Sequence, residues 1–199
     1  MKKTFALVGA GGHAKVIIEI IEEMGGEIAM INDTAPIDNL HGYTVTQELP
    51  PPELPVIISV GNNKIRKKIA SALPNIFGTA IHPKANLSTR CSINEGTVVM
   101  AGATINSDAV IGKHCIINTN ASIDHDCVIG DFVHISPGVS LAGNVTVGEG
   151  TQVGIGSSVI PGVNIGKWVS IGAGAAVIAN VPDFAVVVGV PGKIIKYNQ

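Results

Sequence analysis

The chain has 199 residues with 13 basic and 15 acidic side chains, which gives a formal net charge of −2. This balance leaves no basic excess for nucleic acid, and no apolar stretch reaches the roughly 18 residues of a membrane-spanning helix. The apolar run after Lys2 and Lys3 ends at Gly11-Gly12. That is too short for a signal peptide, so we expect a cytoplasmic protein. Charged residues make up only 14% and glycines number 24, which predicts a fold that turns often and hides apolar surface regularly.

Residues 1–78 alternate between strand and helix patterns. Short apolar runs at 3–9, 27–31 and 55–60 predict strands, whereas 14–24 and 63–73 have helical spacing. Gly25-Gly26 is a stop signal for the first helix, and Asn62 or Asn63 is a suitable cap for the second. With residues 77–81 as a last strand, the order β-α-β, loop, β-α-β predicts a small Rossmann-like α/β domain with a parallel sheet.

A glycine-rich turn joins the first strand to the first helix. Gly9-Ala10-Gly11-Gly12-His13-Ala14 fits the pattern G-x-G-x-x-A, in which backbone and helix N-terminus approach a pyrophosphate. Asn32-Asp33 ends the next strand about 20 residues later, where an acidic residue would meet a ribose or base. We expect a phosphate-bearing ligand here rather than redox use of NAD, because the domain is about half a full dinucleotide fold. A tight turn without a ligand is the alternative.

Residues 79–199 are predicted to form a second domain, a six-residue repeat followed by a C-terminal tail. Every sixth residue from Ile81 to Val177 is Ile, Leu or Val, which makes 17 positions without an exception. A β-sandwich would instead alternate with period two and have irregular turn spacing. The pattern therefore predicts an all-β domain built as a parallel β-helix, a three-sided prism with about 18 residues per coil.

Two residues before each large aliphatic lies a small or β-branched residue. The three cysteines, Cys91, Cys115 and Cys127, all fall in this second inward column. Free cysteine in such a position behaves as a small buried hydrophobe. An odd count in a chain of this kind predicts neither a disulfide framework nor a catalytic thiol.

Three histidines lie within the repeats and outside the inward columns. His125 stands near a corner between Asp124 and Asp126, and a neighbouring carboxylate can fix its tautomer and raise its basicity. The separations of His114, His125 and His134 are 11 and nine residues. Neither is a multiple of 18, so the three do not stack, and a zinc site would need ligands from a partner chain. We therefore expect no metal.

Several segments together resemble one family. They are the unbroken hexads, Gly-Ala-Gly-Gly-His-Ala-Lys-Val at 9–16, Ser-Val-Gly-Asn-Asn-Lys-Ile-Arg at 59–66, Asp-His-Asp-Cys at 124–127 and Val-Gly-Val-Pro-Gly-Lys at 188–193. The chain resembles, over essentially its whole length, bacterial hexapeptide-repeat acyltransferases with an N-terminal nucleotide-sugar domain. UDP-4-amino-sugar N-acetyltransferases of bacillosamine-type pathways are most similar, with sialic acid O-acetyltransferases and perosamine N-acetyltransferases as relatives.

The resemblance implies a left-handed β-helix and a homotrimer that binds acetyl-CoA between neighbouring prisms. It assigns His125 as general base, with Asp126 as the acidic neighbour where similar members often carry Glu. It places His134 on the acetyl-CoA side and makes the Gly143 amide the group that polarises the thioester carbonyl. The CoA chain would run near Ile155 and Ala173.

The same resemblance gives the nucleotide site and the reaction. Residues expected to hold the nucleotide sugar are Gly11, Gly12, His13, Asn32, Asp33 and Gly61. We expect acetylation of the 4-amino group of a UDP-linked amino-deoxyhexose, by direct transfer in a ternary complex. The alternatives are O-acetylation of sialic acid or another sugar, a γ-carbonic-anhydrase-like zinc enzyme, and a scaffold that binds nucleotide sugars without turnover.

Overall fold

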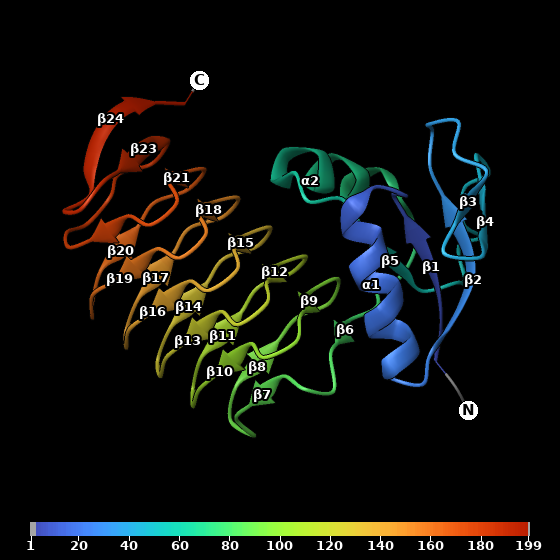
Figure 1. Cartoon of the computed structure of the whole chain (residues 1–199), viewed down its shortest axis with the longest axis horizontal. Helices are drawn as coiled ribbons and strands as arrows, with labels where there is room; N and C mark the ends of the chain where they lie inside the picture. The colour runs from blue at the N-terminus through green and yellow to red at the C-terminus, as the bar shows by residue number, and fades with distance from the viewer. Residues whose placement is uncertain (1–2, 199) are drawn as a thin grey trace.

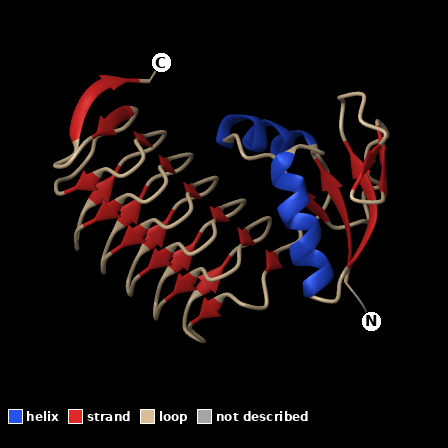
Figure 2. Cartoon of the chain, in the orientation of Figure 1, coloured by secondary structure: helices blue, strands red, loops and turns tan. Residues whose placement is uncertain are grey.

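The computed structural model describes residues 3–198, which form an N-terminal α/β domain followed by a prism (residues 80–198) (Figure 1). Both helices lie in the N-terminal domain, and the prism consists of short strands and turns (Figure 2). The elements of the first domain are β1 (Thr4–Val8), α1 (Gly12–Glu23), β2 (Glu27–Asn32), β3 (Asn39–Leu40), β4 (Tyr43–Thr46), β5 (Val56–Ile58) and α2 (Asn63–Ala72).

The sheet of the N-terminal domain has the order β3-β4-β2-β1-β5, and β1 pairs in parallel with both β2 and β5. Ile17, Ile20 and Ile21 bury one face of α1, as their helical spacing predicts. The Asn62 side chain accepts a hydrogen bond from the Ile65 N–H and so caps α2. The predicted helices and the three predicted strands are confirmed.

The sequence prediction was wrong in two places in this domain. The segment expected to be a loop contains the hairpin β3–β4, whose turn places His41 and Gly42 at φ 51° and 89°. β4 then extends the sheet by pairing in parallel with β2. The expected last strand, 77–81, is split: Phe77 forms one isolated bridge with Val56, and β6 belongs to the prism.

The prism has three faces, and from β6 to β22 each is a sheet of parallel strands that lie 18 residues apart and pair in register, as Ile105 does with Ile123. At the C-terminal end of face 3, β23 pairs in parallel with β21 and β24 pairs antiparallel with β23. Face 1 contains β7 (Asn86–Leu87), β10 (Thr104–Ile105), β13 (Ser122–Ile123), β16 (Ser140–Leu141), β19 (Ser158–Val159) and β22 (Ala176–Val177). Face 2 contains β8 (Ser92–Ile93), β11 (Val110–Ile111), β14 (Val128–Ile129), β17 (Thr146–Val147) and β20 (Asn164–Ile165). Face 3 contains β6 (Ala80–Ile81), β9 (Val98–Val99), β12 (Ile116–Ile117), β15 (His134–Ile135), β18 (Gln152–Val153), β21 (Ser170–Ile171), β23 (Ala185–Val188) and β24 (Lys193–Tyr197).

The hexad aliphatics fill the interior of the prism, so the predicted β-helix is confirmed. Ile105, Ile111, Ile117 and Ile123 have no exposed surface. Face 3 carries the N-terminal domain: the apolar face of α1 and the outward side chain of Ile116 belong to one buried cluster. Among residues 3–198 no helix is long and apolar enough to cross a membrane.

Candidate functional site

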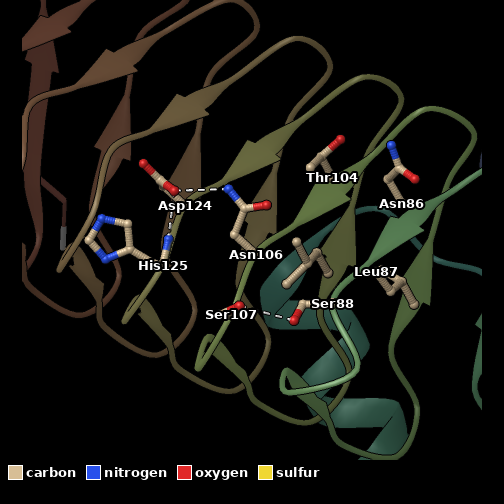
Figure 3. Close-up of a pocket in the computed structure, with 9 residues that line it drawn as sticks. Asn86, Leu87, Ser88, Thr104, Asn106, Ser107, Asp124 and His125 are labelled. Carbon is tan, nitrogen blue, oxygen red and sulfur yellow. Dashed lines mark hydrogen bonds between the residues drawn. The ribbon is translucent and has the colours of Figure 1, made fainter.

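His125 lies at the corner that follows β13, with 55% of its side chain exposed. Asp124 fixes the backbone there, because its Oδ1 accepts the His125 N–H at 2.8 Å and the Asn106 Nδ2 at 2.8 Å. Asp126 has φ 59°, a left-handed conformation that Asp tolerates. Its carboxylate lies 2.7 Å from His125 Nδ1. Figure 3 shows the corner beside Asn106.

Two carboxylates act on the His125 imidazole. The hydrogen bond to Asp126, and then the charge of Asp124, raise the pKa of His125. The Asn106 amide and the His125 N–H lower the pKa of Asp124, which therefore stays ionised. When the Nδ1 proton is donated to Asp126, Nε2 is the basic atom of the ring.

Gly143 lies one coil beyond His125 and directly beside its ring. A Cβ at Gly143 would lie 2.6 Å from His125 Cε1 and 2.7 Å from Nε2, so any side chain there would displace the imidazole. Within residues 3–198 the Gly143 N–H has no hydrogen-bond partner. The structure therefore brings together a basic nitrogen and an available backbone donor.

A cleft of about 440 Å³ opens on face 1 next to this corner. Its walls carry mainly amide and hydroxyl groups, and Asp124 is the charged residue among them (Figure 3). The lining residues are Asn86, Leu87, Ser88, Thr104, Ile105, Asn106, Ser107, Asp124 and His125.

A second cluster lies between face 3 and the N-terminal domain. His134 projects from β15, and its Nε2 lies 3.1 Å from Asn118 Nδ2. Burial, followed by the charges of Arg66 and His13, lowers the pKa of His134 to about 3. Burial and Arg66 lower the pKa of His13, in the first turn of α1, to about 4. The buried His13 Nε2 has no hydrogen-bond partner within residues 3–198, which marks a polar position open to a ligand.

Two of the predicted nucleotide residues, Asn32 and Asp33, line a cavity of about 470 Å³ together with Gly9 and Val60. Gly11, Gly12, His13 and Gly61 are not among its lining residues. Asp33 closes the glycine turn, since its Oδ2 accepts the Ala10 N–H at 2.6 Å. The Asn32 amide points elsewhere and donates to the Glu48 carbonyl at 2.8 Å. Asn32 therefore holds the strand end instead of offering its amide to the cavity.

The glycines of this region are required for two different reasons. At Gly9, φ is 112° and a Cβ would lie 2.7 Å from Val60 Cγ2, so packing excludes a side chain. A Cβ at Gly11, Gly12 or Gly61 would meet no atom within 4 Å. Packing among residues 3–198 therefore does not require glycine at these three positions. A ligand could approach the backbone closely there, and this would favour glycine.

Ile155 and Ala173 are exposed at the corner that follows face 3, one above the other, and the Gly174 N–H bonds to the Ile155 carbonyl at 2.8 Å. His125 and Gly143 instead lie at the corner that follows face 1. Within one chain the predicted site is thus divided between two surfaces. Sequence reasoning missed Asn118 and Arg66, because an Asn after a hexad aliphatic is a common turn residue and Arg66 lies on an ordinary amphipathic helix.

Cys115 and Cys127 are buried in the prism interior, and Cys91 is half-buried against it. Burial raises the pKa of Cys115 to about 12. No group of three His, Cys, Asp or Glu side chains within residues 3–198 is arranged to hold a metal ion.

Comparisons with known proteins agree with this architecture. Residues 4–73 match the PglD N-terminal domain, and residues 108–143 match the bacterial transferase hexapeptide (six repeats). The chain is 44% identical over 113 residues to the UDP-N-acetylbacillosamine N-acetyltransferase of Bacillus subtilis (strain 168). That match covers 50% of this chain and 52% of the relative, so the chain aligns with about half of its length.

Two solved structures match over nearly the whole chain. The acetyltransferase domain of PglB from Neisseria gonorrhoeae FA1090 has a TM-score of 0.91 and 36% identity, and the match covers 98% of this chain and 100% of that one. PerB from Caulobacter crescentus, in complex with CoA and GDP-perosamine, has a TM-score of 0.92 and 39% identity, with 97% of each chain covered. The chain belongs to the hexapeptide-repeat sugar N-acetyltransferases with a PglD-type N-terminal domain.

Proposed function

We propose that this protein transfers the acetyl group of acetyl-CoA to the 4-amino group of a UDP-linked amino-deoxyhexose. The observation that carries the proposal is the His125 corner. An exposed imidazole is bonded through Nδ1 to Asp126, and its ring lies beside Gly143, whose N–H has no hydrogen-bond partner within residues 3–198. A base and an adjacent donor are what an acyl transfer to an amine requires.

The reaction follows from these two groups. A sugar amine is mostly protonated at neutral pH, so it first releases one proton to water. As its lone pair attacks the thioester carbonyl carbon, His125 Nε2 takes a second proton from the nitrogen. The Gly143 N–H donates to the oxyanion, an interaction typically worth roughly 10²–10³ in kcat. The C–S bond breaks as the carbonyl reforms, and the imidazolium returns its proton to the CoA sulfur. No covalent acyl-enzyme is needed, so transfer is direct in a ternary complex.

The complete site is formed by two chains of a homotrimer. His125 and Gly143 lie at one corner of the prism, whereas His13, Asn118 and His134 lie over face 3. We place acetyl-CoA between neighbouring prisms, so that its chain passes Ile155 and Ala173 of the prism that contributes His134. The structure of the Neisseria relative with acetyl coenzyme A supports this substrate.

The nucleotide sugar occupies the N-terminal domain of the chain that contributes His134. Its phosphates approach Gly11 and Gly12, where a Cβ would meet no atom within 4 Å, and His13 Nε2, which has no partner within residues 3–198, is a polar contact. Asp33 borders the nucleotide from the cavity, and the open backbone of Gly61 lies on its other side. The Bacillus relative supports a UDP-sugar, and the free thiols suit the reducing cytoplasm.

Release of CoA from acetyl-CoA, measured against a panel of nucleotide-linked amino sugars and free sialic acid, tests the proposal. We expect turnover with a UDP-4-amino sugar and none with sialic acid. His125→Ala should lower kcat by about 10²–10⁴-fold, and Ser122→Ala, an outward substitution on β13, should not.

Acetylation of sialic acid in place of every amino sugar would overturn the substrate, and a metal requirement would favour the zinc alternative. Equal turnover by the wild type and His125→Ala would remove His125 from the mechanism. No turnover on any member of the panel would favour a scaffold.

A further inference from the structure

The corner of the prism that faces α2 carries a column of residues that, unlike the other two corners, includes aromatic rings among its positive-φ positions. Every eighteenth residue there has positive φ, and two rings of the column stack: His114 and Phe132 lie 5.0 Å apart at 7°. We call this column the seam. Its members are Gly96, His114, Phe132, Gly150 and Trp168, with φ of 73°, 53°, 59°, 69° and 54°.

Arg66 of α2 is buried at the seam, with 1% of its surface exposed. A guanidinium has five N–H donors, and the structure gives Arg66 five acceptors. Nε donates to the His114 carbonyl at 2.8 Å, and Nη2 to the Phe132 carbonyl at 3.0 Å and Asn63 Oδ1 at 2.8 Å. Nη1 donates to the carbonyls of Val60 and Gly61 at 3.0 and 3.1 Å.

These acceptors come from two separate parts of the molecule. His114 and Phe132 belong to the prism, whereas Val60 and Gly61 form the loop between β5 and α2. Val60 also lines the nucleotide cavity. A single side chain therefore ties the edge of that cavity to the coils that precede His134.

The burial of this charge is costly. Within residues 3–198 no carboxylate pairs with Arg66, and burial lowers its pKa to about 10. A buried cation is tolerated only when its donors are all satisfied. Lysine has three donors at a single point and cannot span carbonyls on opposite sides of the side chain. The geometry therefore requires arginine specifically.

We propose that Arg66 is a positioning residue that holds the Val60–Gly61 loop against the prism and so sets where a bound nucleotide sugar presents its amine. This inference rests on the proposed function. The charge of Arg66 also helps to keep His13 and His134 neutral, as the lowered pKa values of both show. Neutral imidazoles can both donate to and accept from a sugar hydroxyl.

Lys67 provides a matched control on the same helix. Its Nζ pairs with Glu149 and lies 5.9 and 5.5 Å from the ring centroids of Phe132 and Trp168. Lys67 thus joins α2 to the prism as Arg66 does, but the structure shows no contact between its side chain and the Val60–Gly61 loop.

The test compares Arg66→Lys, Arg66→Met and Lys67→Ala in the full-length protein. We expect both Arg66 variants to lose about 10²-fold in kcat/KM for the nucleotide sugar, the order of loss that a small misplacement produces. The KM for acetyl-CoA should change by less than about twofold, because CoA lies on the prisms. Lys67→Ala should keep both constants even if its Tm falls.

If Arg66→Met fails to fold, the kinetic constants of Arg66→Lys alone test the inference. Wild-type constants in Arg66→Lys, or a KM for acetyl-CoA that rises as much as the KM for the nucleotide sugar, would overturn the inference and leave Arg66 with a purely structural role. Calorimetric titration with UDP separates this inference from the proposed function. If the wild type binds UDP but turns over no amino sugar, the proposed function fails, while weaker UDP binding by Arg66→Lys than by Lys67→Ala still supports the inference.

Discussion

The basicity of His125 depends on the backbone of the residue that follows it. Asp126 adopts φ 59°, which turns its short side chain back toward the ring of the residue before it, and Oδ2 reaches His125 Nδ1 at 2.7 Å. Asp and Asn tolerate this conformation better than other residues with a Cβ. The short side chain of an aspartate can therefore reach the imidazole from this position.

Asp126→Asn tests this contact by pH. The Asp126 carboxylate stabilises the imidazolium and raises the pKa of His125, so its removal lowers that pKa. Because His125 must be neutral to act as a base, kcat/KM rises as pH increases through its pKa. We expect the acid limb of the kcat/KM profile to move to lower pH, with a lower plateau.

Asp108→Asn is the control for this experiment. Asp108 occupies the same corner one coil earlier, with φ 62°, but makes no bond to His125. Its profile should match that of the wild type. An acid limb in Asp126→Asn that stays in place or moves to higher pH would show that the carboxylate does not set the basicity of His125.

At the scale of the element, each coil is stable because its inward side chains meet the same kind of side chain above and below. Ile123 pairs in register with Ile105 and Leu141 and has no exposed surface. It also ends the strand from which the His125 corner begins. Loss of this packing would therefore weaken the support of the site as well as the core.

Ile123→Ala should lower the free energy of unfolding by about 2–5 kcal/mol, the cost of removing a buried aliphatic and leaving a cavity. Ser122→Ala, on the outward side of the same strand, should change it by no more than about 0.5 kcal/mol. Urea denaturation of both variants measures the difference. Equal stability of the two variants would contradict the inward stacking of the hexads.

A helix or strand could be predicted wherever a single local sequence pattern determines it. The hexad period identifies the prism, and helical spacing with caps identifies α1 and α2. The hairpin β3–β4 was not predicted, because its strands are short. Tyr43–Thr46 is a strand because it pairs with β2. That pairing is tertiary and leaves only a weak local pattern.

At the scale of the whole molecule, the domain arrangement decides what the histidines do. The hexads place both His125 and His134 outside the inward columns, and on that evidence they look alike. The structure leaves His125 exposed but covers His134 with the N-terminal domain, beside His13 and Arg66. No repeat pattern shows which face another domain covers, so this cluster could not be predicted from the residues alone.

The same arrangement divides the predicted site between two surfaces of one chain, and the proposed reaction needs both. His125→Ala impairs only the surface at the corner that follows face 1, which carries the general base. His134→Ala impairs only the surface over face 3. In a mixed oligomer, a site between two chains can take an intact His125 from one and an intact His134 from the other. Variants with separate defects should therefore complement each other.

Co-assembly of equal amounts of His125→Ala and His134→Ala, followed by measurement of acetyl-CoA-dependent turnover, tests the two-chain site most directly. With random assembly, about one quarter of the sites receive both intact histidines, so activity should recover to about a quarter of the wild-type value. Activity no higher than the mean of the two separate variants would contradict a site shared between chains.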